Sequence, residues 1–309
     1  MYEKDRKTVN ILGVRVDSTS TSSVLRYIRT RLAKFEAGQP QKPKFLIVTP
    51  NPEQIMRAQH DALFAKILNS ADISIPDGIG LIAADKFLSL PTISSKGRSA
   101  LGWNYYLKPF LYFAQGLGVG FSIIFDRNWL MKDLKVIRGR ELFMELIKLA
   151  NKKRWRVFLL GDRLKSGQKA IEALKKSYKG VKLSAADGPN LDEDANPKEK
   201  EDRRLEEEAI RVINKMNPHI LFVGFGAPKQ EKWLYRHWNK LNFGGAMVLG
   251  GTFDYISGKK KFPPKWIEDS NLEWLWRLLT KDQKTKRILN AFPRFAIMVF
   301  NAKLRQNPY

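Results

Sequence analysis

Two short apolar runs in this sequence end on polar groups that can act on a bound molecule. "FLIVTPN" leads into Thr49 and Asn51, and "ISIPDGIG" places Asp77 directly before Gly78. A carboxylate at the end of a buried run is partly removed from water, which raises its pKa and makes it a better proton acceptor. Asp77 is therefore a candidate general base, and Gly78 would let a ligand approach the backbone.

The segment "VGFGAPKQE" has the composition of an anion-binding loop. Gly224 and Gly226 free the backbone after an apolar run, and a proline then suits the first turn of a helix. Unpaired N–H groups at such a helix start attract a diphosphate, and Gln230 can add hydrogen bonds. Asp254 follows the apolar run "AMVLGG" and is a further candidate for binding a nucleotide.

Two of these positions also have a purely structural explanation. Asn51 stands before a proline, and this pair is a good N-cap and first residue for the helix expected after it. Asp77 followed by Gly78 is also a turn sequence. The sequence alone leaves both explanations open.

The sequence gives less support to metal-dependent catalysis, nucleophilic hydrolysis or a phosphate-binding loop of the P-loop type. The chain has no cysteine and three histidines, and it lacks the H-E-x-x-H and G-x-S-x-G patterns of zinc proteases and α/β-hydrolases. "GDRLKSGQK" fails as a phosphate loop, because Ser166 occupies a required glycine position and Lys169 is displaced. The acids of "DED" at 192–194 resemble a metal-binding motif, but they lie in a charge-rich segment that we expect to be solvated.

The candidate residues must be positioned by strands, because each follows an apolar run. Such runs alternate with amphipathic stretches and occupy residues 44–48, 72–75, 156–161, 181–184, 219–226 and 246–251. This alternation predicts an α/β fold with a doubly wound, mostly parallel, Rossmann-like sheet. Ligands bind beyond the carboxyl ends of the strands in such sheets. We expect this core to cover residues 1–254.

The charge balance points to an anionic partner. The chain has 55 basic and 31 acidic residues, a net charge of +24. That excess predicts attraction to nucleic acid, anionic lipid or phosphorylated substrates without choosing among them. Residues 255–309 carry twelve basic and four acidic residues and are expected to form a basic helical appendage. The charged N-terminus lacks the apolar core of a secretory signal, so we expect a cytoplasmic location.

Two apolar segments lie outside the alternating pattern. In the insertion 87–135, "PFLYFAQGLGVGFSIIF" has no charge, but three glycines and a length below about 20 residues make it a poor membrane-spanning helix. Flanking aromatic and basic residues favour a segment at the membrane surface, and a helical hairpin packed on the core is the alternative. The helix expected at 292–306 also needs a partner, either protein or lipid.

Six motifs occur in the order and spacing of one glycosyltransferase family, from about Val9 to Arg294: "TPNPEQ", "IPDGIG", "VGFGAPKQEKW", "GGTFDYISGK", "PKW" and "EWLWRL". The chain resembles the family of the TagA/WecG/CpsF type, which includes the N-acetylmannosaminyltransferases of wall teichoic acid and enterobacterial common antigen synthesis. The resemblance implies inverting transfer of a sugar from a UDP-sugar to a polyprenyl-diphosphate-linked sugar at the inner membrane face, without an obligatory metal or other cofactor.

The resemblance also implies roles for single residues. Asp77 takes the position of the base. The substrate-binding positions are Thr49, Asn51, Gly78, Gly224, Gly226, Gln230 and Asp254. Arg277, Lys284 and Arg287 fall in the basic C-terminal segment and would contact the acceptor's diphosphate.

One segment departs from the family pattern. The family usually carries Arg-Val-x-Gly-x-Asp before the middle strand, whereas this chain has Val136 at the arginine position and Glu141 at the aspartate. Arg138 or Arg140 is a candidate substitute. This departure leaves the identity of the donor sugar open.

The expected partners are the UDP-sugar, the lipid-linked acceptor and an anionic membrane surface, and a homo-oligomer is left open. Two other classes of protein are alternatives. A nucleic-acid-binding protein would explain the charge, but the tail lacks a known binding module and Asp77 and Asp254 would repel phosphate. A nicotinamide-dependent oxidoreductase would explain the α/β pattern, but no G-x-G-x-x-G follows the first strand.

Overall fold

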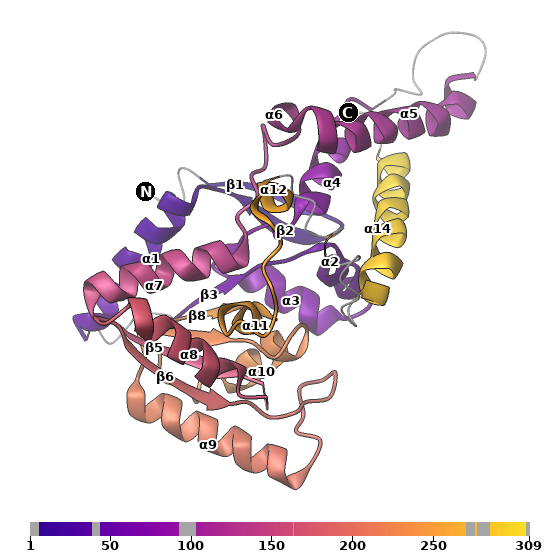
Figure 1. Ribbon diagram of the computed structural model, residues 1–309. Helices are drawn as coiled ribbons and strands as arrows, with labels where there is room; N and C mark the ends of the chain where they lie inside the picture. The colour runs from indigo at the N-terminus through magenta and orange to yellow at the C-terminus, as the bar shows by residue number, and fades with distance from the viewer. Residues whose placement is uncertain are drawn as a thin grey trace.

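The computed structural model describes residues 6–38, 44–92, 103–162, 164–269, 276 and 285–306. Its centre is a parallel sheet flanked by helices (Figure 1). The sheet has six strands in the order β4-β3-β8-β7-β5-β6. The strands are β3 Phe45–Val48, β4 Ile73–Ser74, β5 Arg156–Gly161, β6 Lys182–Asp187, β7 Ile220–Val223 and β8 Gly245–Val248. Each predicted apolar run overlaps one of these strands, so the predicted doubly wound α/β fold is confirmed.

The central strands are apolar throughout because both faces of the sheet are covered. In β5, Phe158 and Leu160 join one buried cluster, while Val157 and Leu159 join a second. This alternation follows from the two-residue period of a strand. Sequence periodicity cannot show it, since neither face of such a strand is polar.

The helices divide between the two faces of the sheet according to these clusters. On the first face lie α2 Pro52–Ala58, α3 Ala62–Ser70, α4 Ile79–Ser89, α9 Lys200–Met216 and α10 Lys229–His237. On the second lie α1 Thr21–Glu36, α7 Gly139–Lys153, α8 Ser166–Ser177 and α11 Thr252–Ile256.

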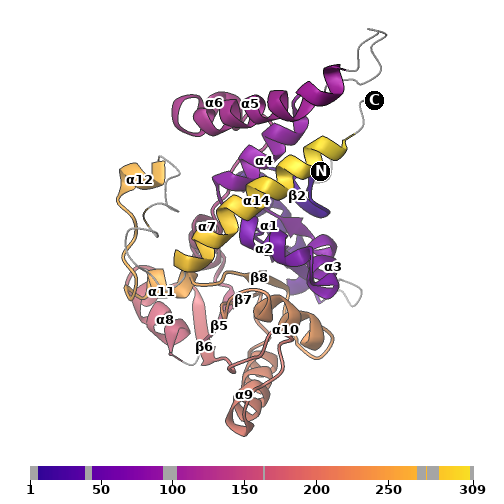
Figure 2. The same cartoon turned by 90° about the vertical axis from the view of Figure 1, so that its right-hand side faces the viewer.

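A layer of helices is attached to α4 at one end of the molecule (Figures 1 and 2). It contains α5 Trp103–Phe125, α6 Arg127–Leu130 and the C-terminal helix α14 Thr285–Arg305, and the short α12 Lys265–Asp269 precedes α14 in the chain. The predicted apolar helical insertion and helical C-terminal appendage are therefore present. Phe295 and Val299 of α14 are each 4% exposed against the first cluster, so this side of the tail helix has protein as its partner.

An antiparallel hairpin, β1 Lys7–Ile11 and β2 Val14–Ser18, was not predicted. It lies against the outer strand β4, where the Ser74 amide donates to the Asp17 carboxylate at 2.8 Å and Ser74 Oγ donates to the Arg15 carbonyl at 2.7 Å. The hairpin thereby satisfies part of the open edge of the sheet, which would otherwise be a site for unwanted pairing.

Candidate active site

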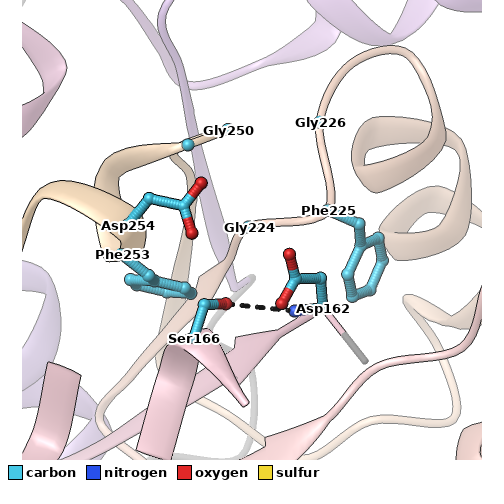
Figure 3. Close-up of a pocket in the computed structure, with 9 residues that line it drawn as sticks. Asp162, Ser166, Gly224, Phe225, Gly226, Gly250, Phe253 and Asp254 are labelled. Atoms are coloured by element: carbon cyan, nitrogen blue, oxygen red, sulfur yellow. Dashed lines mark hydrogen bonds between the residues drawn. The ribbon is translucent and has the colours of Figure 1, made fainter. Parts of the chain in front are cut away.

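All six strands of the sheet are parallel, so the residues that follow them meet at the carboxyl ends of the strands. We call this end of the sheet the carboxyl edge, or simply the edge. Helix α8 follows β5 on one face and α10 follows β7 on the other, which makes the boundary between β5 and β7 the topological switch point. A pocket opens there (Figure 3). It is lined by Asp162, Ser166, Gly224, Phe225, Gly226, Gly250, Gly251, Phe253 and Asp254.

Gln230 holds two sides of this pocket together. Its side chain is 2% exposed, and Oε1 accepts hydrogen bonds from the Gly226 amide at 3.0 Å and the Gly250 amide at 3.1 Å. Its Nε2 donates to Glu231 Oε1 at 2.9 Å. Gln230 therefore positions the loops after β7 and β8. Direct contact between Gln230 and a substrate stays a prediction.

Glu231 is buried behind the same loops. Complete removal from water raises its pKa from 4.5 to about 7, against the opposing hydrogen bond from Gln230. Its Oε2 has no hydrogen-bond partner within the part of the chain that the structure describes. The site thus contains an acid that is protonated over much of the pH range in which ordinary carboxyls are charged.

The glycine at position 224 is required by close packing. A Cβ there would lie 2.7 Å from the Phe253 ring, which is too short for a real contact, and 3.0 Å from the Gly250 carbonyl oxygen, which is tighter than most contacts. The backbone of β7 therefore reaches the loop after β8 without a side chain between them. The loops after β7 and β8 therefore pack directly against each other where they line the pocket.

The segment rejected as a phosphate loop forms another wall of the pocket. Ser166 begins α8, and its Oγ accepts a hydrogen bond from the Asp162 amide at 3.3 Å. Asp162 directly follows a predicted strand, but Ser166 was not predicted as a site residue. One sequence signal could have identified Ser166 as a site residue: a strand ends at Gly161 and a helix begins five residues later, although the phosphate-loop spacing is absent.

Asp254 presents an acceptor to the pocket. Its side chain is 14% exposed, and Lys259 Nζ lies 3.6 Å from its Oδ1. That oxygen is buried and has no hydrogen bond from any described residue. Figure 3 shows Asp254 and Asp162 on either side of the pocket. A ligand hydroxyl or N–H group could donate to the part of the Asp254 carboxylate that faces the pocket.

The residues of the first two motifs lie further along the same edge. Asp77 follows β4, and its amide donates to the Pro50 carbonyl at 2.9 Å, which ties the two motifs together. Gly78 has φ +103°, a conformation that favours glycine, and it is the N-cap residue of α4. Because β4 lies two strands from β8, Asp77 and the nearest wall of the pocket, formed by the loop after β8, are separated by roughly 10 Å along the sheet.

Thr49 and Asn51 follow β3, between β4 and the pocket. Asn51 Oδ1 accepts a hydrogen bond from the Gln54 amide at 2.9 Å, so the predicted N-cap of α2 is confirmed. A Cβ on Gly139 would lie 3.3 Å from the Thr49 methyl group. The first turn of α7 therefore also reaches this edge.

A model of the glycosyl transferase WecG/TagA/CpsF family matches residues 9–99 and 118–309. The chain belongs to this family. It is 27% identical over 295 residues to a protein of Staphylococcus aureus (strain MRSA252), covering 96% of this chain and 93% of that protein. A protein of Bacillus subtilis (strain 168) is 25% identical over 296 residues, covering 94% of each chain. Both relatives are named N-acetylglucosaminyldiphosphoundecaprenol N-acetyl-beta-D-mannosaminyltransferase.

Membership makes this chain a glycosyltransferase, in agreement with the resemblance of its motifs. Its segment 136–141, which departs from the family pattern, forms the start of α7 beside Thr49. Arg138 Nη1 donates to Glu141 Oε1 at 2.7 Å, and the Arg140 guanidinium lies 5.6 Å from the centre of the Phe262 ring. Both arginines are therefore near the edge, and the choice between them stays open.

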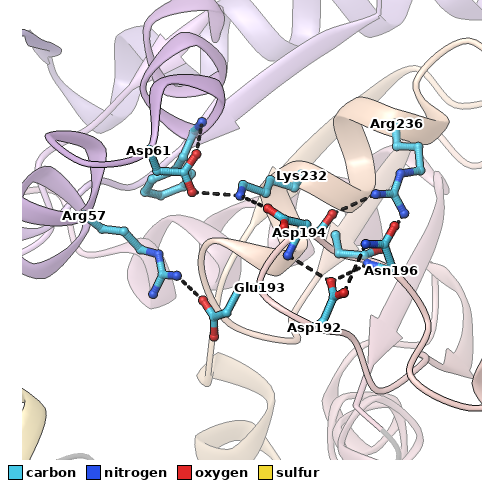
Figure 4. A network of polar contacts seen from close by, with 10 residues as sticks. Arg57, Asp61, Asp192, Glu193, Asp194, Asn196, Lys232 and Arg236 are labelled. Atoms are coloured by element: carbon cyan, nitrogen blue, oxygen red, sulfur yellow. Dashed lines mark hydrogen bonds and ion pairs between the residues drawn. The ribbon is translucent and has the colours of Figure 1, made fainter.

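The acids of the glycosyltransferase's "DED" segment have protein partners (Figure 4). Glu193 pairs with Arg57, and Asp194 shares Lys232 with Asp61 at 2.9 and 2.8 Å. These contacts join the loop after β6 to α2, α3 and α10. Across the described ranges, no group of three or more His, Cys, Asp or Glu residues is arranged to hold a metal ion.

Part of the predicted acceptor site cannot be placed. Arg277 and Lys284 lie outside the described residues, and Arg287 falls in the first turn of α14. Their contact with a diphosphate stays a prediction.

Proposed function

We propose that this glycosyltransferase moves a sugar of the N-acetylmannosamine type from a UDP-sugar to a polyprenyl-diphosphate-linked sugar in the synthesis of a cell-surface polysaccharide. The names of its relatives support this choice of sugar and lipid-linked acceptor. The observation that carries the proposal is the single sheet edge that joins the glycine-lined pocket to Asp77.

The pocket between β5, β7 and β8 suits part of the nucleotide. Its empty space is about 310 Å³, including the part open to solvent, which is at the lower end for a small-molecule site. The Asp254 carboxylate would accept a hydrogen bond from a ribose hydroxyl or from the N–H of uracil. Gly226 leaves the backbone open beside it, Gly224 keeps a side chain out of the close contact with Phe253, and Lys259 brings a positive charge to the same wall.

The transferred sugar would then extend along the edge toward β3 and β4. Thr49, Asn51 and Gly78 are the proposed contacts of the sugars there. The acceptor hydroxyl oxygen forms a bond to the anomeric carbon while the bond from that carbon to the UDP oxygen breaks, and UDP leaves with the electron pair. The Asp77 carboxylate accepts the hydroxyl proton. Attack from the side opposite UDP inverts the anomeric configuration.

The departing diphosphate needs positive charge, and we propose that protein groups supply it without an obligatory metal or other cofactor. Candidates are helix starts at the edge and cations of the basic segment 255–309. Arg277, Lys284 and Arg287 would instead hold the diphosphate of the acceptor. Because that acceptor is anchored in lipid, the enzyme would act as a peripheral protein at the cytoplasmic face of the cell membrane.

The test is a screen of UDP-sugars for UDP release with a short-chain lipid-diphosphate N-acetylglucosamine as acceptor. We expect acceptor-dependent release with a UDP-N-acetylhexosamine, and a product whose anomeric configuration by NMR is opposite to that of the donor. Retained configuration would overturn the single-displacement mechanism. Release of UDP from no donor, by protein that is folded by circular dichroism, would overturn the proposed function.

The acceptor site has a separate test. Changing Arg277, Lys284 and Arg287 together to alanine should abolish transfer while UDP binding and melting temperature stay unchanged. Normal transfer by this variant would show that the basic segment does not hold the acceptor's diphosphate.

A further inference from the structure

Helix α5 exposes an apolar stripe along its length. Phe110, Phe113, Leu117, Phe121 and Ile124 are between 50% and 69% exposed. Their spacing of three and four residues places them on one side of the helix. A stripe of this length is unusual on the surface of a soluble protein and marks an interaction site.

The opposite side of α5 packs on the rest of the protein. Tyr112, Val119 and Ser122 are at most 6% exposed, and they span about 15 Å of helix. Lys108 Nζ donates to the Leu304 carbonyl of α14 at 3.1 Å. These contacts hold α5 along α4 and α14 over most of its length.

This packing determines how α5 can meet a lipid bilayer. By length and composition, Leu107–Phe125 is apolar enough to cross a membrane. Crossing would carry the neighbouring helix α14 into the hydrocarbon, with its exposed Arg294, Asn301 and Arg305. Charged groups there are costly. A helix that lies flat in the interface buries its stripe and leaves these groups in water.

Charge around the stripe favours an anionic surface. Residues 107–135 include four basic and two acidic residues, and residues 285–306 include no acid. Lys132 and Lys135, just beyond α6, are exposed. The whole chain carries a net charge of +24. Basic residues beside an apolar stripe are typical of helices that bind anionic lipid, because each strengthens the attachment.

Helix α4 connects this stripe to the proposed active site. It begins directly after Asp77 and Gly78, and its 11 residues span about 16 Å. At its far end, Lys303 of α14 donates to the carbonyls of Leu88 and Leu90. A bilayer that holds α5 would therefore lie about one helix length from the proposed base, on the side of the sheet edge.

We infer that the exposed stripe of α5 binds in the headgroup region of an anionic phospholipid bilayer, with the helix parallel to the membrane plane. The family model leaves out residues 100–117, which include much of α5, so the inference does not follow from membership. It deepens the proposed function by naming the surface that brings the enzyme to a lipid-linked acceptor. Its test measures membrane binding without donor or acceptor, so the two proposals can fail independently.

The first experiment is flotation of the full chain with vesicles of phosphatidylcholine mixed with phosphatidylglycerol. The variant Phe110→Ser/Phe113→Ser/Phe121→Ser should reduce the partition coefficient by about tenfold or more. The matched control, Leu63→Ser/Tyr235→Ser, removes exposed apolar side chains from α3 and α10 and should bind like the unchanged protein. Transfer to a short soluble acceptor should be equal in all three. Equal flotation of all three proteins, or none by the unchanged protein, would overturn the inference.

A second experiment uses the absence of cysteine from the chain. A polarity-sensitive dye on Leu117→Cys should shift to the blue when vesicles are added, whereas the same dye on Leu63→Cys should not. Membrane binding without a shift at position 117 would show that another surface binds lipid. A shift at 117 that appears without vesicles as protein concentration rises would mean that a second copy of the chain covers α5, which also overturns the inference.

Discussion

At the carboxyl edge of the sheet, Gln230 Oε1 accepts hydrogen bonds from the amides of Gly226 and Gly250. In the layer formed by α4, α5 and α14, Lys303 Nζ donates to the carbonyls of Leu88 and Leu90. Each buried side chain joins two backbone groups, and in both regions this fixes the elements that surround a surface. The surfaces themselves differ.

The edge presents polar groups to a ligand, such as the Asp254 carboxylate in the wall of the pocket. The helical layer leaves Phe110, Phe113 and Phe121 exposed instead. A polar pocket suits a water-soluble nucleotide, and an apolar stripe with basic neighbours suits a membrane. Under the two proposals, the chain separates binding of a soluble donor from attachment to lipid, with α4 as the connection.

The largest effect should come from Asp77→Asn. The amide cannot accept the hydroxyl proton, so the turnover number should fall by about 10²–10⁴-fold. UDP binding, vesicle binding and unfolding should stay unchanged, because α5 and the pocket are intact. The control is Asp85→Asn, a change of the same kind within α4. Stopped transfer in both variants, or normal turnover in the first, would contradict the role of Asp77.

Glu231→Gln should alter how stability depends on pH. The folded protein keeps the Glu231 proton up to about pH 7, whereas the unfolded chain releases it near 4.5. The native state therefore binds more protons in this interval, and stability falls as pH rises through it, by about 3 kcal/mol in total. The glutamine side chain in the variant would stay neutral and remove that loss.

The measurement is the free energy of unfolding in urea at about pH 5 and about pH 8. The variant should gain stability relative to the unchanged protein at the higher pH only. A difference in the free energy of unfolding that is the same at both pH values would mean that Glu231 has an ordinary pKa. The carboxyl edge would then contain no buried acid with a raised pKa.

Lys303→Met should have a smaller effect, confined to the helical layer. The unbranched apolar side chain fills most of the space but leaves two carbonyls at the end of α4 without their donor, which should lower the free energy of unfolding by about 1–2 kcal/mol. Lys135→Met changes an exposed lysine and serves as the control. UDP affinity should be equal in both variants. A loss of UDP binding in Lys303→Met alone would show that the two regions are coupled.

The smallest effect is expected from a chelator. If protein cations neutralise the departing diphosphate, EDTA should leave the rate of transfer unchanged. Loss of activity that magnesium or manganese restores would show that a metal shares this task at the edge.

Much of the fold could be predicted from the sequence because burial on both faces demands continuous apolar runs. The run at 156–161 became β5, and the pair Asn51-Pro52 caps a helix as its side chain requires. The hairpin β1–β2 was missed because β1 is mostly exposed and neither strand is a continuous apolar run, and because its attachment depends on Asp17 reaching Ser74, far away in the chain.

The candidate site was predictable only as separate pieces. Residues after apolar runs do meet at one edge, as parallel strands require. The strand order, which sets β5 beside β7 and β7 beside β8, decided that Ser166 lines the same pocket as Gly224 and Asp254. Substrate contact by Gln230 stays a prediction, and only the structure shows that its Oε1 also accepts hydrogen bonds from two glycine amides, one of them 20 residues away.

The sequence by itself determined the types of element, the polar residues that end the strands and the positive charge of the tail, since these depend on local preferences and composition. Only the tertiary structure decided which side of α5 is exposed. That helix is apolar all round, so periodicity does not distinguish Tyr112, which is buried, from Phe113, which is 56% exposed. The distinction arises because α4 and α14 can cover only one side of α5, and the other side stays exposed to the surroundings of the protein.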